Sequence, residues 1–417
     1  MNNTNIIREL KYDYDDLSIV PAEKTSIESE SDVDVHIKNS AVREEDGMLP
    51  IFTSPKDFVV DEYNYKIFRN NGIIPIINKN VRIEKRLELT KQGEWCAYSL
   101  GEFDSIFNND NDVSIYEGLS EVKALIEPAF GNMRHILNSA IQAKNLVCKR
   151  FDGKCRLVLM AGSVVNPKTS LNYGWAEIDY IRCSGGFKNE SPDNTSIPVH
   201  YPAASLIMEV RNIKKKSPEV SSKIVADGGF KNISEAIVAL ACGADYVMID
   251  NMLGSLFESS AAFDNMYKFV NTSNGYFDGM KDNREFVFVV KIKDNNICKE
   301  YDNLAIRYSL PDYKIVNTID VRIMYISLTL EQMQIDEIGR WVIKHTTLWK
   351  IMKDSEQEVT SEVKQTLKQW TERFKDMLSS VMFCCNKRQL ADFVGHVVLV
   401  PNIHVRNSIF VYKDVNA

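Results

Sequence analysis

The sequence lacks a long apolar run and a surplus of basic residues. No uninterrupted apolar stretch approaches the roughly 20 residues that a membrane-spanning helix requires. Lysine and arginine together number 50, against 57 aspartates and glutamates, and the formal net charge is −7. Proteins that bind nucleic acids or membrane surfaces usually carry a basic face. We therefore expect no nucleic acid and no membrane among the partners of this chain.

The sequence also lacks the ligand spacings of a metal site and the cysteine pattern of a secreted disulfide framework. Its 8 cysteines and 6 histidines stand at no zinc-like intervals. Residues 1–16 contain no basic and apolar signal region. We expect a cytoplasmic protein with reduced thiols that holds no metal through its side chains.

The strongest structural pattern lies in residues 223–259. Residues 223–226 predict a short apolar strand, Asp227 to Gly229 a tight turn, 233–242 a helix and 246–249 a second apolar strand. A strand, a helix and a strand within so few residues indicate a parallel βαβ unit. Both strands are apolar on both faces, as in a covered sheet or a closed barrel. Glycines at the carboxyl end of the first strand would let backbone N–H groups approach a ligand closely.

The rest of the first 260 residues repeats this alternation of strands and helices. We expect further strands at 73–77, 95–100, 113–116, 125–128, 157–160 and 178–182, and helices at 132–144 and 202–214. Eight strands favour an α/β fold of the TIM (β/α)₈ barrel type over an open sheet. The interval from Tyr116 to Ala124 is too short for a parallel crossover. Either the strand at 113–116 is misread, or the barrel is incomplete and lacks a helix there.

Several of these segments resemble the IMP dehydrogenase and GMP reductase family, whose members are purine nucleotide oxidoreductases on a (β/α)₈ barrel. Asp15 to Pro21 resembles the opening Asp-Asp-Val-Leu-Leu-x-Pro of the family. Leu125 to Asn132 resembles Leu-Asp-Val-Ala-His/Asn-Gly, and Ala161 to Val165 resembles Ala-Gly-Asn-Val-Val. The closest similarity is Ala226 to Gly229 followed by Gly243 to Met248, because both halves occur at the family spacing.

The resemblance is nearer to GMP reductase in layout. Dehydrogenases usually carry a regulatory module after the second strand, and Tyr98 runs to Val113 here without room for one. The resemblance implies IMP or GMP as the nucleotide, NADP or NAD as the cofactor, and a homo-oligomer. It places Glu127, which replaces the family Asp, at the cofactor.

The family loop that carries the catalytic cysteine aligns without a gap to residues 181–209. The cysteine attacks the purine C2 in the family, and its position here is Ser191. Asn189 replaces the serine that binds the phosphate, and Asp193 replaces a threonine that is a candidate acid in the reductase. Ser191 and Asp193 are thus the candidate catalytic residues. A serine needs an activating base, for which Asp193 and His200 are the candidates. We expect nearby Cys183 to be a small buried hydrophobe rather than a relocated nucleophile.

The nucleotide site implied by the resemblance is changed at its phosphate end. Asp250 and Asn251 replace the Gly-Gly or Gly-Ser whose amides cradle the phosphate in the family. A carboxylate beside a phosphate is repulsive, unless a cation intervenes or the side chain points away. The remaining nucleotide-binding positions keep their family types. They are Asp227 for the ribose hydroxyls, Gly228 and Gly229 for backbone approach, and Gly279 and Met280 in a flap-like Tyr276–Met280. A simple strand-to-helix turn at 227–229 is the alternative.

The C-terminal third departs from the family. Residues 285–292, 304–310 and 320–328 predict an inserted antiparallel β element. Residues 360–382 predict a helix that packs an apolar stripe on the barrel. We therefore expect a barrel over 1–280, an inserted element over 281–335 and a C-terminal helical segment over 336–417.

Two functional classes fit the sequence. The first is a purine nucleotide oxidoreductase that transfers hydride between IMP or GMP and NADP or NAD. The second is a catalytically inactive pseudoenzyme that keeps the barrel for binding, assembly or regulation. The replacement of the nucleophile by Ser191 predicts that ordinary turnover is absent or very slow.

Overall fold

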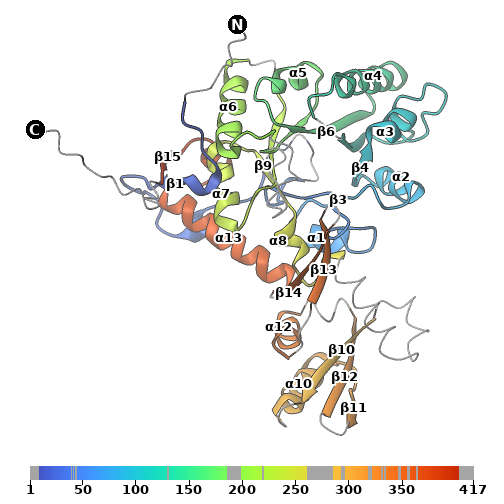
Figure 1. Cartoon of the computed structure of the whole chain (residues 1–417), viewed down its shortest axis with the longest axis vertical. Helices are drawn as coiled ribbons and strands as arrows, with labels where there is room; N and C mark the ends of the chain where they lie inside the picture. Colours follow the sequence, from blue (N-terminus) through green and yellow to red (C-terminus); the bar gives the residue numbers. More distant parts are fainter. Residues whose placement is uncertain are drawn as a thin grey trace, which may run out of the picture.

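The fold is described from a computed structural model (Figure 1). The described residues are 9–38, 40, 42, 45–128, 131–185, 199–217, 220–260, 285–292, 296–317, 322–329, 332, 335–345, 349–354, 357–362 and 365–402.

Eight parallel strands form a nearly closed barrel, in the order β2-β9-β8-β7-β6-β5-β4-β3. They are β2 (Ile51–Thr53), β3 (Ile76–Ile77), β4 (Trp95–Ser99), β5 (Glu121–Glu127), β6 (Arg156–Val164), β7 (Tyr180–Cys183), β8 (Lys223–Asp227) and β9 (Tyr246–Ile249). A single bridge between Phe52 and Ile74 spans the seam between β2 and β3. There the Thr53 amide donates to the Ile74 carbonyl at 3.0 Å. The predicted (β/α)₈ barrel is confirmed, with one weakly bonded seam.

Helices follow most of the strands. They are α1 (Tyr65–Asn70), α2 (Ile83–Lys91), α3 (Leu100–Phe107), α4 (Arg134–Phe151), α5 (Thr169–Trp175), α6 (Ala203–Lys216), α7 (Ile233–Cys242) and α8 (Asn251–Gly254). Local sequence fixes the ends of α7. The Asn232 side chain caps its first turn, and Gly243 ends it at φ 113°, a left-handed conformation that glycine adopts without strain. The predicted βαβ unit is confirmed.

The expected strand at 113–116 is wrong. These residues lie in turns, and β2 is the strand that completes the eight. The apolar pattern has another cause, because Ile115 and Tyr116 are buried without belonging to a sheet. Tyr116 packs its ring on Phe107 of α3 and donates its hydroxyl to the Phe107 carbonyl. The crossover that looked too short is therefore not needed.

The amino end of the barrel is filled by aromatic rings around one buried carboxyl group. Trp95, Tyr180 and Tyr246 are each the first residue of their strand, so they lie at this end. Tyr180 and Tyr246 donate their hydroxyls to Glu45 at 2.8 and 2.9 Å. Phe52 packs against all three rings. The barrel is thus closed at its amino end by side chains.

The next part of the chain forms a smaller unit with its own core. It contains β10 (Glu285–Ile292), α10 (Asn296–Tyr308), β11 (Lys314–Asn317), β12 (Arg322–Thr329) and α12 (Asp336–His345). The sheet is antiparallel in the order β10-β12-β11. The predicted strands at 285–292 and 320–328 correspond to β10 and β12. The predicted strand at 304–310 is wrong, because most of it belongs to α10, whose Ile297 and Tyr301 bury one helical face. Since α12 joins the same core, we propose that the inserted element includes it.

The chain then returns to the barrel. A hairpin of β13 (Trp349–Asp354) and β14 (Gln357–Glu362) precedes α13 (Leu367–Cys384), α14 (Leu390–Phe393) and β15 (Val398–Pro401). β15 pairs antiparallel with β1 (Leu17–Val20), which lies between the short 3₁₀ helices η1 (Tyr14–Asp16) and η2 (Glu30–Asp32). The helix predicted from residue 360 begins at Leu367, because Thr366 caps it. Its apolar stripe is buried in the barrel core, as predicted. Figure 1 shows α13 running below α7.

Candidate functional site

The carboxyl ends of neighbouring barrel strands bring charged residues together. β7 contributes Arg182, β8 ends at Asp227, and β5 ends at Glu127. Lys79 follows β3, and Ser163 lies near the end of β6. In parallel barrels this end carries the ligand site, because the loops after the strands surround it. The sequence predicted Asp227 and Glu127 here, but not the two cations that pair with them.

The ion pair of Arg182 and Asp227 is the centre of this constellation. The Arg182 Nη2 and Nε atoms donate to the Asp227 Oδ2 at 2.7 and 3.1 Å. The Ser163 hydroxyl reaches the same oxygen at 3.3 Å. Side-chain exposure is only 9% for Arg182 and 11% for Asp227, so water screens the pair little. Burial disfavours the charged guanidinium, but the attraction of Asp227 and Glu127 outweighs it and raises the pKa of Arg182.

Two polar atoms of this constellation keep unused hydrogen-bonding capacity. Among the described residues, the buried Nη1 of Arg182 has no acceptor, and the buried Oε2 of Glu127 accepts no hydrogen bond of good geometry. Lys79 approaches that Glu127 oxygen at 3.3 Å as an ion pair. Native proteins rarely leave buried donors and acceptors unmatched, because each costs free energy. A ligand group or water that offers both an acceptor and a donor would complete this part of the barrel.

The turn after β8 is not covered by any described residue close to its glycines. Gly228 and Gly229 have φ of +75° and +80°, which glycine adopts more readily than other residues. A Cβ atom added at either position would meet none of the described residues within 4 Å. The turn is therefore glycine-rich because of its backbone conformation, and the described residues leave room for a ligand beside it.

Asp250 and Asn251 lie at the neighbouring end of β9. Asp227 pairs with Met248 in the sheet, so Asp250 is two residues beyond that partner. The Asp250 carboxylate accepts from the Asn251 amide at 2.6 Å and caps α8. The Asp250 side chain thus supplies its own anion to the adjacent backbone.

The loop after β5 touches the end of β6 through its backbone. A Cβ atom at Gly131 would lie 1.9 Å from the Ser163 carbonyl oxygen, so no larger residue fits without a shift of the main chain. The Tyr173 hydroxyl donates to the Gly131 carbonyl and so holds the loop after β5 in place. This contact positions Ser163, which in turn bonds Asp227.

The candidate catalytic residues Ser191 and Asp193 lie outside the described residues, as do Asn189, Gly279 and Met280. The base of the predicted catalytic loop is described. The Tyr201 amide donates to the Gly185 carbonyl at 2.7 Å, and His200 lies 3.9 Å from Asp13. Cys183 is 1% exposed, and burial raises the pKa of its thiol. It is the small buried hydrophobe that we predicted.

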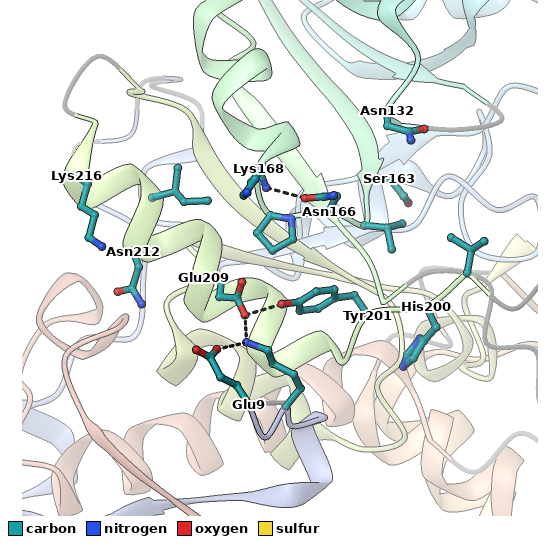
Figure 2. Close-up of a pocket in the computed structure, with 15 residues that line it drawn as sticks. Glu9, Asn132, Ser163, Asn166, Lys168, His200, Tyr201, Glu209, Asn212 and Lys216 are labelled. Atoms are coloured by element: carbon teal, nitrogen blue, oxygen red, sulfur yellow. Dashed lines mark hydrogen bonds and ion pairs between the residues drawn. The ribbon is translucent and has the colours of Figure 1, made fainter. Parts of the chain in front are cut away.

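A cavity of ≈ 940 Å³ opens beside this loop base, lined by residues of the β6–α5 connection and of α6. Figure 2 shows Tyr201 and Glu209 pointing toward each other, with Ser163 among the residues that line the cavity. The Tyr201 hydroxyl donates to Glu209 at 2.6 Å, and Lys11 donates to the same oxygen at 2.7 Å. Sequence reasoning missed this cluster, because Lys11 is 198 residues from Glu209.

The described part of the chain lacks two features. No group of three or more histidine, cysteine, aspartate or glutamate side chains is arranged there to hold a metal ion. No helix among the described residues is long and apolar enough to cross a membrane.

Comparison with known proteins adds an independent line of evidence. Residues 126–280 match the model of the IMP dehydrogenase / GMP reductase domain. GMP reductase 2 of Bos taurus is 23% identical over 261 residues, which are 61% of this chain and 72% of that protein. GMP reductase 2 of Homo sapiens is 23% identical over 262 residues, with the same shares. GMP reductase 1 of Homo sapiens is 23% identical over 252 residues, 58% of this chain and 69% of that protein.

Proposed function

We propose a function on the premise that this chain belongs to the IMP dehydrogenase / GMP reductase family and is nearer to GMP reductase. The carboxyl end of its barrel binds a purine ligand, in family terms IMP or GMP, together with NADP or NAD. The observation that carries this proposal is the buried Arg182–Asp227 pair beside the open turn at Gly228 and Gly229. It combines fixed charge with space at the ligand end of the barrel.

The residues have separate roles in this proposal. Asp227 accepts from the ribose hydroxyls with its second carboxylate oxygen, while Arg182 holds the first. Gly228 and Gly229 offer backbone close to the ligand. Glu127 and the free Nη1 of Arg182 supply an acceptor and a donor that fit the cofactor. When bound, the nicotinamide cofactor supplies or accepts the hydride, and the chain's own residues bind and orient both partners.

We further propose that turnover is absent or very slow, since Ser191 replaces the cysteine thiolate. Ser191 and Asp193 remain the candidates for any residual chemistry. The second functional class, a pseudoenzyme with a binding, assembly or regulatory role, is favoured by the capping of α8 by Asp250. A homo-oligomer and a cytoplasmic location remain proposals.

The first test is a thermal-shift and calorimetric titration of the full chain with IMP, GMP, XMP, NADP(H) and NAD(H). A ligand that binds only the folded protein raises its apparent stability by mass action. We expect stabilisation by at least one purine compound. No response to any of them would overturn the proposed function.

The second test is a hydride-transfer assay that compares the natural chain with Ser191→Cys. We expect little or no turnover from the natural chain and a rise in Ser191→Cys if the lost thiolate is the main defect. The matched control is Cys183→Ser, which removes a buried thiol that we place outside the chemistry. Ordinary turnover by the natural chain would contradict the proposed absence of activity. Continued inactivity of Ser191→Cys would favour the pseudoenzyme.

A further inference from the structure

Two aspartates occupy equivalent positions immediately before barrel strands. Asp179 precedes β7 and accepts from the Leu159 amide of β6 at 2.9 Å. Asp245 precedes β9 and accepts from the Ile224 amide of β8 at 2.8 Å. Both carboxylates also attract cationic side chains from neighbouring elements. The two clusters can therefore be compared for how well each carboxylate neutralises the cations around it.

The cluster around Asp179 is well matched. Lys144 of α4 and Arg156 of β6 donate to separate oxygens of Asp179 at 2.9 and 2.7 Å. The Arg156 side chain is 46% exposed, so water also solvates its charge. Each cation of this cluster thus has a direct hydrogen bond to the carboxylate.

The cluster around Asp245 contains more cations and less favourable contacts. The Arg211 Nη1 and the Lys223 Nζ lie 3.7 and 3.8 Å from the same oxygen, Oδ1, and the Lys214 Nζ lies 3.7 Å from Oδ2. These distances are too long for hydrogen bonds. Lys214 instead donates to the Ser222 carbonyl at 2.5 Å. Arg211 and Lys223 therefore converge on one oxygen of Asp245 without a direct hydrogen bond to it.

The excess positive charge of this cluster is only partly screened by water. The exposed fractions of the Arg211, Lys214 and Lys223 side chains are 18%, 20% and 37%. Burial lowers the pKa of Lys214, and repulsion from Lys223 and Arg211 lowers it further against the attraction of Asp245. Three cations around one carboxylate leave two positive charges without a counterion among the described residues.

The Arg211 side chain is held in place by backbone. A Cβ atom at Gly243 would lie 2.9 Å from the Arg211 Cγ, and one at Gly395 would lie 3.4 Å from its Nε. That buried Nε has no acceptor among the described residues. A guanidinium that is already fixed loses little entropy when an anion binds to it. Arginine also contacts the oxygens of a phosphate group through several donors at once.

We propose that Arg211 and Lys223 bind a phosphate-type dianion beside Asp245, between α6 and the starts of β8 and β9. Both nitrogens lie within 3.8 Å of one Asp245 oxygen, so a single oxyanion can contact both. Its two negative charges balance the excess of the cluster, and the bound anion stabilises the fold. The ligand is inorganic phosphate or the phosphate group of a small phosphomonoester. This site is separate from the purine site at the carboxyl end, and it does not rest on the proposed function.

The experiment is a calorimetric titration of the full chain with inorganic phosphate and, separately, with ribose 5-phosphate, in chloride at constant ionic strength. It compares the natural chain with Lys223→Met, which removes one half-buried cation of the cluster. The matched control is Lys144→Met, which removes a cation that Asp179 already neutralises. Thermal unfolding without phosphate provides a second measurement on all three proteins.

We expect Lys223→Met to bind phosphate about tenfold more weakly than the natural chain, as the loss of one charge-assisted hydrogen bond implies. Lys144→Met should leave phosphate binding unchanged. Without phosphate, Lys223→Met should unfold at the same temperature as the natural chain or a higher one, because repulsion is relieved, whereas Lys144→Met should unfold at a lower temperature.

Tighter binding of ribose 5-phosphate than of phosphate, with the same loss in Lys223→Met, would assign the site to a phosphomonoester. Equal binding would assign it to the free ion. Absence of phosphate binding by the natural chain overturns the inference. Equal phosphate binding by the natural chain and Lys223→Met also overturns it, because the anion then binds elsewhere. Failure to bind any purine compound overturns the proposed function alone.

Discussion

The two ends of the barrel differ in how completely their buried ionisable side chains are hydrogen-bonded. At the amino end, Glu45 receives hydroxyl hydrogen bonds from Tyr180 and Tyr246 at 2.8 and 2.9 Å, inside a ring of aromatic side chains. At the carboxyl end, among the described residues, Arg182 keeps one buried nitrogen without an acceptor, and one buried oxygen of Glu127 meets Lys79 only as an ion pair at 3.3 Å. A satisfied buried network stabilises the fold, whereas an unsatisfied one costs free energy until a partner arrives. We infer that the amino end serves stability and the carboxyl end serves ligand binding.

The largest expected loss of stability at the carboxyl end comes from replacing Arg182. Arg182→Met leaves Asp227 as a buried carboxylate without its main partner. Breaking a buried ion pair in this way destabilises proteins by about 3 kcal/mol or more. Urea unfolding measures the change in the free energy of unfolding. We also expect weaker binding of every purine ligand, because Asp227 is no longer held in place.

The matched control is Arg182→Lys, which keeps the charge but loses the two-pronged contact and the free Nη1. It recovers most of the stability lost in Arg182→Met, but not the ligand affinity. Equal stability of Arg182→Met and the natural chain would show that the carboxyl-end pair is not part of the folded core.

A smaller effect is expected from Gly131→Ala. The added Cβ atom meets the Ser163 carbonyl oxygen, so the loop after β5 must move away from the end of β6. Such overpacking costs about 2 kcal/mol, and the displaced Ser163 loses its bond to Asp227. The control is Gly153→Ala at the amino end, where a Cβ atom meets none of the described residues within 4 Å and φ is +74°. Gly153→Ala loses only about 1 kcal/mol of stability, because alanine is disfavoured at a left-handed φ. Urea unfolding of both variants tests this, and equal losses would contradict the close contact.

The sequence predicted the elements whose signals are local. The βαβ unit around α7 was found because apolar periodicity, Asn232 and Gly243 lie within a few residues of the elements they define. β2 was missed because it is only 3 residues long. The prediction of a strand at 304–310 was wrong because a short apolar pattern does not distinguish a strand from the buried face of a helix.

The candidate site was only partly predictable, because its contacts join distant parts of the chain. Asp227 and Glu127 were found through the family resemblance, but the pairing of Arg182 with Asp227 spans 45 residues. Lys79 carried no motif that could have marked it as the partner of Glu127. The hydrogen bonds to Glu45 span 135 and 201 residues, and no periodicity indicates them. Predicting such contacts requires the order of the strands in the barrel, which cannot be read from the sequence alone.

The smallest expected effect is the pH dependence of stability that Glu45 causes at the amino end. Burial raises the pKa of Glu45, although hydrogen bonds from Tyr180 and Tyr246 act against it. The folded protein then holds this proton more firmly than the unfolded chain. The contribution of Glu45 to stability is therefore complete below the unfolded pKa and is lost as pH rises through the folded pKa.

Half-buried Asp34 provides the opposite case. Burial acts against the shift, but hydrogen bonds from Lys38 and His36 lower the pKa of Asp34 to about 2. Its contribution is complete above the unfolded pKa and is lost as pH falls through the folded pKa. Urea unfolding over a pH series compares the natural chain with Glu45→Gln and Asp34→Asn. As pH rises, the natural chain should lose its advantage over Glu45→Gln and gain advantage over Asp34→Asn. If the difference in the free energy of unfolding between the natural chain and Glu45→Gln stays constant with pH, Glu45 is charged throughout. The amino end would then bury a carboxylate rather than a protonated carboxyl group.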